Sequence, residues 1–195
     1  MKNKTLWIVL GVIAVVVVWA ISGYNGLVTK QEKVNEAWAN VETVYQRRAD
    51  LIPNLVSTVK GYAAHEQETL QSVTDARANA TSISIDPSTA TPEQMEAWMA
   101  AQNEVGSALG RLIAISENYP DLKANQNFME LQKQLEGTEN RISTERRKYN
   151  EKVREFNVAI RKFPKNLIAS MFGFEKMLLF EAQEGAEVAP VVSFE

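Results

Sequence analysis

The feature that most constrains this chain is an uncharged apolar run near its N-terminus. Residues 6–22 read LWIVLGVIAVVVVWAIS and contain no Asp, Glu, Lys or Arg. A helix needs about 20 apolar residues to cross the hydrocarbon core of a bilayer, and the run approaches that length when the next two residues are included. Trp7, Trp19 and Tyr24 lie near its ends, where aromatic rings favour the membrane interface. Because a single segment satisfies all its backbone polar groups in lipid only as a helix, we predict a membrane-spanning helix that contacts the lipid bilayer from Leu6 to Tyr24.

Two other interpretations of this run are weaker. A buried helix of a soluble protein is seldom free of charge over such a length. A cleavable signal peptide has a shorter apolar core and a small-x-small cleavage site, and the best match here, Ala20-Ile21-Ser22, has no turn-forming residue just before it. A lipoprotein anchor is excluded because the chain has no Cys to acylate. We interpret the run as an uncleaved, single-pass anchor.

The charges beside the anchor leave open which side of the membrane the body occupies. Lys2 and Lys4 precede the run, whereas Lys30 and Lys33 follow it. Only cationic residues near a span set its orientation, so these residues and the terminal amine give a small bias towards a cytoplasmic N-terminus.

Composition limits the class of protein that follows the anchor. The chain has 195 residues, which leaves one domain of ordinary size. Its formal net charge is −3, which argues against nucleic acid as a partner, because nucleic-acid binders carry a basic surplus. The absence of Cys excludes disulfides and thiolate metal sites.

The rest of the chain has the periodicity of long helices. An apolar stripe in alternating steps of four and three runs from Val34 to Ala80, and it passes through Pro53, where we expect a packed kink. A second helix opens at 91–94 with Thr-Pro-Glu-Gln, which is a capping box with proline at the first helical position. After a break at 119–121, a third stripe extends from Phe128 to Phe163.

These elements predict an all-α fold, in which an N-terminal transmembrane helix precedes a long up-down helical bundle. The bundle has three long helices plus a shorter C-terminal helix, which lies within residues 167–174 and ends at Gly173. We divide the chain into an N-terminal tail (1–5), the anchor (6–24), the bundle (25–183) and an acidic C-terminal tail (184–195) with extended character at 188–192.

Several long segments of this sequence resemble those of the LemA family of bacterial membrane proteins. They are YNGLV (24–28), RRADLIPNLVSTVKGYAAHE (47–66), ENYPDLKAN (117–125), LQKQLEGTENRI (131–142) and RRKYNEKVREFN (146–157). The resemblance implies an N-terminal helix in the bacterial cell (inner) membrane and a helical-bundle body. It implies no reaction, because the family has no agreed molecular activity. It also implies an N-terminus outside the cytoplasm, which opposes the charge bias, so the side of the body stays open.

Few residues are candidates for chemistry. His65 is the only histidine and cannot by itself supply the repeated ligands of a di-metal or zinc site, so we interpret His65-Glu66 as structural or solvated. Charges that interrupt the apolar stripes are interpreted as register-setting ion pairs, with a ligand site as the alternative: Arg48, Glu66, Glu139 and Arg146.

A second group of charges lies on the third helix. Its cations are Arg146, Arg147, Lys148, Lys152, Arg154, Arg161 and Lys162. Glu145, Glu151 and Glu155 alternate with them at helical spacing, which favours a solvated face with ion pairs over a lipid or acidic-partner patch. Asparagines 118, 125, 127, 150 and 157 are expected to cap helices and bond backbone. We predict no catalytic residue, cofactor or metal site.

The sequence therefore favours a non-enzymatic scaffold or self-assembling rod of roughly 60 to 80 Å. We expect a homo-oligomer with contacts at residues 34–52 and in the apolar segment after Phe163, because the second helix is too short to cover the first. Refolding of the fourth helix over this face would instead give a monomer. The alternatives in function are an accessory binding subunit of a membrane protease or hydrolase and, less favoured, a carboxylate- or metal-dependent enzyme.

Overall fold

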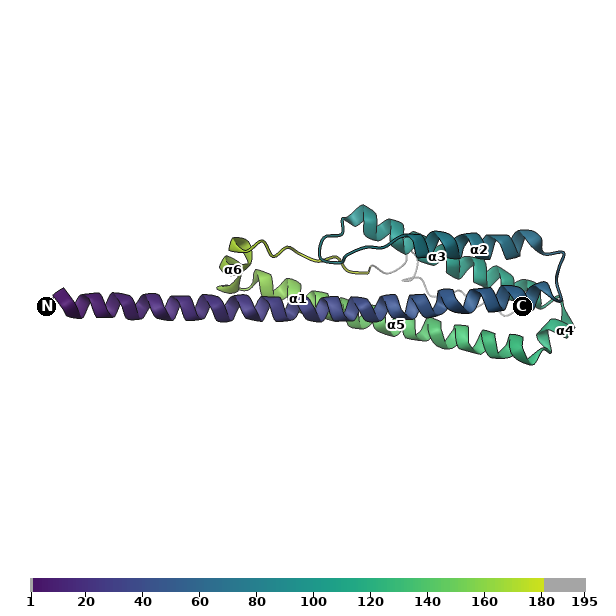
Figure 1. The fold of residues 1–195 in the computed structure, drawn as a ribbon, viewed down its shortest axis with the longest axis horizontal. Coiled ribbons are helices and arrows are strands. Elements are labelled where there is room, and N and C mark those ends of the chain that lie inside the picture. The colour runs from purple at the N-terminus through teal and green to yellow at the C-terminus, as the bar shows by residue number, and fades with distance from the viewer. Residues whose placement is uncertain (1, 181–195) are drawn as a thin grey trace, which may run out of the picture.

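The computed structural model describes residues 2–180, with side chains from Lys4 onward. The chain forms six helices in this range, and Figure 1 shows how they are arranged. They are α1 (Lys2–Lys60), α2 (Gln67–Ser82), α3 (Pro92–Ser116), α4 (Pro120–Lys123), α5 (Gln126–Arg161) and α6 (Lys165–Met171). The described part contains no β-strand, so the predicted all-α class is confirmed. The predicted C-terminal tail lies outside the described residues.

Helix α1 joins two different environments without interruption. It has 59 residues, which corresponds to about 90 Å at the rise of an α-helix. Its first part projects beyond the bundle (Figure 1), and its side chains are exposed from Lys4 to Trp19. This part is long and apolar enough to cross a membrane, by length and composition. The second part, from Leu27 onward, has one face in the core of the bundle.

The second part of α1 forms a four-helix bundle with α2, α3 and α5. Helix α2 runs back along α1, α3 runs in the direction of α1, and α5 returns towards the anchor (Figure 1). Helix α1 packs most extensively on α5, and α2 packs most extensively on α3. The up-down order predicted from the short connections is therefore present.

Two apolar clusters fill this bundle. The cluster nearer the anchor includes Leu27, Val34, Trp38, Val41, Tyr45, Trp98, Tyr149, Phe156, Met177 and Phe180. The cluster at the far end includes Ile52, Leu55, Val59, Val73, Val105, Leu112, Leu122 and Phe128. The apolar face at residues 34–52 was expected to be incompletely covered within the chain. This expectation is wrong, because Trp38, Val41 and Tyr45 are buried in the first cluster.

The helix predicted to be continuous from Val34 to Ala80 is in fact two antiparallel helices. Helix α1 ends at Lys60, where the N–H groups of Tyr62 and Ala63 both donate to the carbonyl of Val59, at 3.0 and 2.8 Å. The apolar stripe conceals this turn because Val59 and Val73 remain two heptads apart across it. Periodicity alone cannot detect a reversal that preserves the repeat. The weak local signal was Gly61, a poor helix former.

Pro53 lies inside α1, and the helix continues through it. Proline has no N–H, so the carbonyl of Ala49 loses its usual helical partner. Arg77 of α2 replaces that partner, because its Nε donates to the Ala49 oxygen at 2.7 Å. Ile52 and Leu55 are buried beside the proline. The side chain of Pro53 itself is exposed, so the predicted packing of the proline is not present. Arg77, which the sequence did not point to, reduces the cost of the missing hydrogen bond.

Local signals set the remaining helix ends. Thr91 Oγ1 accepts from the N–H of Gln94 at 3.3 Å, and Gln94 Oε1 accepts from the N–H of Thr91 at 2.9 Å, so the predicted capping box is confirmed. Asn125 caps α5 by accepting from the N–H of Phe128 at 3.0 Å. Gly173 follows α6 with φ +71°, a left-handed conformation that suits glycine.

Helix α6 packs on α1 where the apolar run ends. A Cβ on Gly23 would lie 2.3 Å from Cδ1 of Ile168, so a side chain at this position would force Ile168 to move. The ring of Tyr24 lies 4.8 Å from that of Phe172 and 5.7 Å from that of Phe174, measured between centroids. The body therefore begins immediately after the predicted span.

We expect a variant that lacks residues 1–22 to form a folded, helical body in detergent-free buffer. Both apolar clusters lie beyond the deleted segment, and Leu27 is their first residue. Circular dichroism and urea unfolding would measure this. A coil-like spectrum at neutral pH would show that the bundle depends on the anchor.

Candidate functional site

A buried cation separates the two apolar clusters. Arg48 lies on α1 between Tyr45 of the first cluster and Ile52 of the second, and its side chain is only 5% exposed. Its Nη1 lies 3.1 Å from Oε1 of Glu139 on α5. Its Nη2 donates to the backbone oxygen of Gln102 on α3 at 2.9 Å and to Oε1 of the same residue at 2.8 Å. A buried guanidinium needs such partners, because an uncompensated buried charge is costly.

Gln102 extends this polar layer to the fourth helix. Its Nε2 donates to the carbonyl of Ala80 at 3.3 Å. Ala80 lies in the last turn of α2, whose carbonyls have no partner within the helix. The layer around Arg48 therefore connects α1, α2, α3 and α5.

The four charges on the stripes do not form two pairs. Arg48 and Glu139 are ion-paired, and the side chain of Glu139 is 48% exposed. Glu66 instead accepts a hydrogen bond from the Tyr119 hydroxyl at 2.9 Å, near the far end of the bundle. Arg146 places its guanidinium carbon 4.7 Å from the centre of the Phe180 ring. One direct pair at the junction of the clusters fits a role in setting register.

Tyr45 connects the polar layer with Arg146. Burial raises the pKa of the Tyr45 hydroxyl, although the charges of Arg146 and Arg48 oppose the shift. The Arg48 guanidinium also lies 4.9 Å from the centre of the Tyr45 ring. The hydroxyl therefore stays protonated at neutral pH, so it supplies hydrogen bonds here rather than a negative charge.

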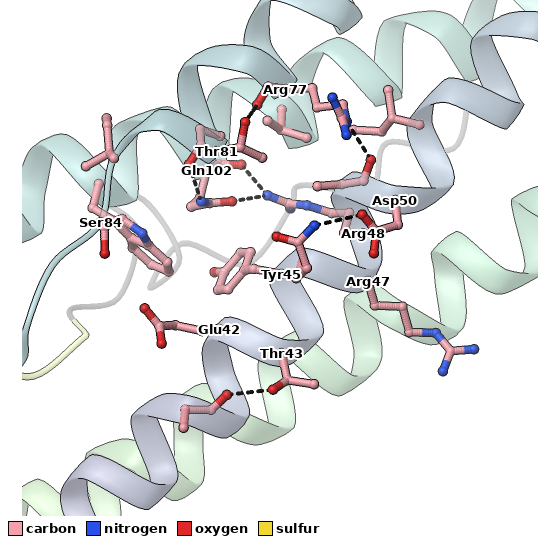
Figure 2. Close-up of a pocket in the computed structure, with 18 residues that line it drawn as sticks. Glu42, Thr43, Tyr45, Arg47, Arg48, Asp50, Arg77, Thr81, Ser84 and Gln102 are labelled. Atoms are coloured by element: carbon pink, nitrogen blue, oxygen red, sulfur yellow. Dashed lines mark hydrogen bonds between the residues drawn. The ribbon is translucent and has the colours of Figure 1, made fainter.

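An open groove of about 780 Å³ lies beside Arg48, between α1, the end of α2 and α3. Figure 2 shows its labelled side chains: Glu42, Thr43, Tyr45, Arg47, Arg48, Asp50, Arg77, Thr81, Ser84 and Gln102. The lining includes carboxylates and guanidiniums, and the dashed lines show Arg48 turned inward to Gln102. The groove is open, which suits a protein surface better than a small-molecule site, since small-molecule sites are usually enclosed.

The described residues hold no group of three or more His, Cys, Asp or Glu side chains that could bind a metal ion. His65 lies exposed in the turn between α1 and α2. The predicted interpretation of His65 as solvated is consistent with this position.

Two of the cations on α5 form ion pairs with neighbouring carboxylates. Lys148 lies 2.8 Å from Glu145, and Lys152 lies 3.1 Å from Glu155. The hydrogen bond from Lys152 lowers the pKa of the Glu155 carboxyl. These exposed pairs fit the predicted solvated face, and surface pairs of this kind add little stability.

A second set of polar contacts holds the residues that follow α6. Residues 174–180 run back along the bundle (Figure 1), and two asparagines of α5 hold their backbone. Asn157 donates to the carbonyl of Met177 at 2.9 Å and accepts from its N–H at 3.0 Å. Asn150 makes the same pair with Phe180, at 2.9 and 2.8 Å. Both asparagines therefore bond backbone, as the sequence predicted.

These contacts place Phe180 over the aromatic part of the first cluster. Its ring stacks on Trp38 with centroids 5.7 Å apart, and it meets the edge of Tyr149 at 5.1 Å. Sequence analysis identified neither this contact nor the role of Gln102. The available signal was the spacing of Asn150 and Asn157, one heptad apart on the stripe side of α5, which puts both amides in one row.

We expect Arg48→Met to lower the free energy of unfolding by about 3 kcal/mol, because the substitution removes charged hydrogen bonds and leaves buried Gln102 groups without a donor. Arg47→Met is the matched control, since Arg47 is exposed on the same helix and turned away from the layer in Figure 2. Urea unfolding measures both. Equal midpoints for the two variants would show that the layer does not stabilise the bundle.

We expect Asn157→Ala to speed amide exchange in residues 174–180 by about tenfold or more, because the Met177 backbone loses both of its partners. Hydrogen exchange followed by mass spectrometry measures this. Asn140→Ala is the control, since Asn140 is an exposed residue of the same helix. Unchanged exchange in the Asn157 variant would mean that ring packing alone holds the segment.

Comparison with known proteins supports the resemblance seen in the sequence. A family model described as the LemA family matches residues 37–194. Magnetosome protein MamQ of Magnetospirillum gryphiswaldense is 28% identical, with 87% of this chain and 68% of the relative covered. Protein LemA of Metamycoplasma hominis is 26% identical, with 82% of this chain and 69% of the relative covered. Together with the apolar part of α1, these relatives indicate a membrane-associated protein. Because the family model matches most of its length, the chain belongs to the LemA family.

Proposed function

We propose that this protein is a non-enzymatic, single-pass membrane scaffold whose helical rod presents binding surfaces at a fixed height above the bilayer. The observation that carries this proposal is the continuity of α1. One helix supplies both the exposed apolar segment and the central face of the bundle. A partner bound to the rod would therefore be held in a defined orientation to the membrane.

The groove beside Arg48 is the surface where we place a partner. It is open, it lies well beyond the end of the apolar run, and its rim carries charges of both signs. Polar rims of this kind are typical of protein interfaces that form and dissociate. The favoured partner is a second copy, because anchoring already restricts the orientation of neighbouring molecules and lowers the entropic cost of their association.

The structure changes where such an oligomer would form contacts. Val34, Trp38, Val41, Tyr45 and Ile52 are buried within the chain, so the apolar face expected at residues 34–52 is not available for another copy. The alternative stated from the sequence was that the fourth helix covers this face. In the structure the non-helical residues 174–180, held by Asn150 and Asn157, lie over Trp38 instead. Lateral contacts would therefore use the polar rim of the groove.

Photo-crosslinking in native membranes tests this function. The chain has no Cys, so Thr43→Cys at the groove can be labelled specifically with a photoreactive maleimide. Lys133→Cys, an exposed position on α5, is the control. We expect adducts from position 43 alone, at multiples of the 21.8 kDa chain mass if the partner is a second copy.

Adducts of other masses would support the alternative, an accessory binding subunit of a membrane protease or hydrolase. The absence of adducts from position 43, or equal adducts from both positions, would contradict a binding role for the groove.

A further inference from the structure

Exposed apolar side chains gather at the anchor end of the bundle. In the described part beyond residue 24, seven large apolar side chains are exposed, and five of them lie between residues 158 and 172. Phe163 is 81% exposed, Met171 77%, Phe172 55% and Leu167 54%. We call these four residues the α6 patch. Soluble surfaces seldom concentrate apolar side chains in this way without a partner.

The patch is one side of an amphipathic element. Leu167 and Met171 are four residues apart and project from the same side of α6. Ile168 and Ala169, on the opposite side, are buried in the first cluster. Helix α6 is thus fixed to the bundle by one face and presents the other outward.

The position of α6 relative to the apolar run indicates that the α6 patch faces the lipid headgroup region. Ile168 fills the space at Gly23, and Phe172 packs on Tyr24, at the end of the apolar run. Residues 6–24 rise by about 28 Å as a helix, close to the thickness of a hydrocarbon core. If they fill that core, α6 lies at the level of the lipid carbonyls and headgroups. Figure 1 shows α6 at the end of the bundle from which the first part of α1 projects.

The charge of this region also fits a lipid surface. Residues 158–174 contain Arg161, Lys162 and Lys165 but no Asp or Glu, although the chain as a whole has a net charge of −3. The carboxylates nearest in sequence are Glu155, which lies 3.5 Å from Lys30 and 3.1 Å from Lys152, and Glu175. Cations beside an exposed apolar face are the pattern of elements that lie in the membrane interface.

We propose that the α6 patch inserts into the interfacial zone of the bilayer beside the span, with Arg161, Lys162 and Lys165 among anionic headgroups. The body then contacts the membrane at two places, through α1 and through α6. Two contacts fix the rotation of the rod about the α1 axis, which a lone spanning helix leaves free. This inference rests on the proposed span at residues 6–24.

Depth-dependent quenching in full-length protein tests the proposal. Single cysteines at Leu167 and Met171 would carry an environment-sensitive fluorophore, in vesicles of phosphatidylcholine with or without phosphatidylglycerol. Lipids with brominated chains serve as the quencher. Met129→Cys, at a position 48% exposed near the far end of α5, is the matched control, and Ile13→Cys reports on the span itself.

We expect the labels at 13, 167 and 171 to be quenched about twofold or more relative to the label at 129, because interfacial apolar residues reach the acyl boundary. Quenching of 167 and 171 only with phosphatidylglycerol would also support the proposal and would assign the attraction to the cations.

Quenching at 13 without quenching at 167 and 171 would overturn the α6 contact and leave the anchor intact. Absence of quenching at 13 would overturn the anchor and the contact together. Self-quenching between labels at 171, without quenching by brominated lipid, would overturn the lipid contact in favour of a second copy.

Discussion

The structure depends on α1 remaining one helix across two solvents. Its first part exposes apolar side chains on all sides, whereas its second part is apolar only on the face towards α5, α2 and α6. Glycines at 23 and 26 weaken the helix at the junction. Ile168 compensates at Gly23 by filling the space that a side chain would take. Helix α6 therefore packs closely on α1 at the position where glycine makes the α1 helix least stable by itself.

The polar layer around Arg48 specifies the register of the helices, which the apolar clusters alone do not. Two apolar stripes with a seven-residue repeat could also pack after a shift of one heptad. Such a shift would move Arg48 away from both Glu139 and Gln102 and leave a guanidinium without partners in the core. An unpaired buried Arg48 would destabilise the shifted register by more than the paired Arg48 stabilises the native register. The layer thus contributes specificity, at the junction where neither cluster alone defines the alignment.

Helix ends that depend on neighbouring residues could be predicted from the sequence. The capping box at Thr91, the break before Pro120 and the glycine after α6 depend on neighbouring residues, so they could be predicted. The turn at 61–66 could not, because it preserves the heptad repeat. The site was harder to predict. Arg48 and Glu139 were identified as charges on the stripes, but the second partner of Arg48, Gln102, is polar, uncharged and typical of any helix surface. The path of residues 174–180 depends on two asparagines far away in sequence, and no local pattern predicts it.

The asparagine contacts also decide which surfaces remain for other molecules. Asn150 and Asn157 bind only the backbone of the returning segment, so they fix its path without selecting its side chains. Selection comes from Phe180, whose ring closes the space between Trp38, Trp98 and Tyr149. The largest aromatic cluster of the described residues is therefore buried inside the rod. Beyond residue 24 of the described part, most of the exposed large apolar side chains lie between residues 158 and 172, at the anchor end of the bundle. Under the two proposals, lipid would contact the anchor end of the bundle and a protein partner would contact the groove beside Arg48.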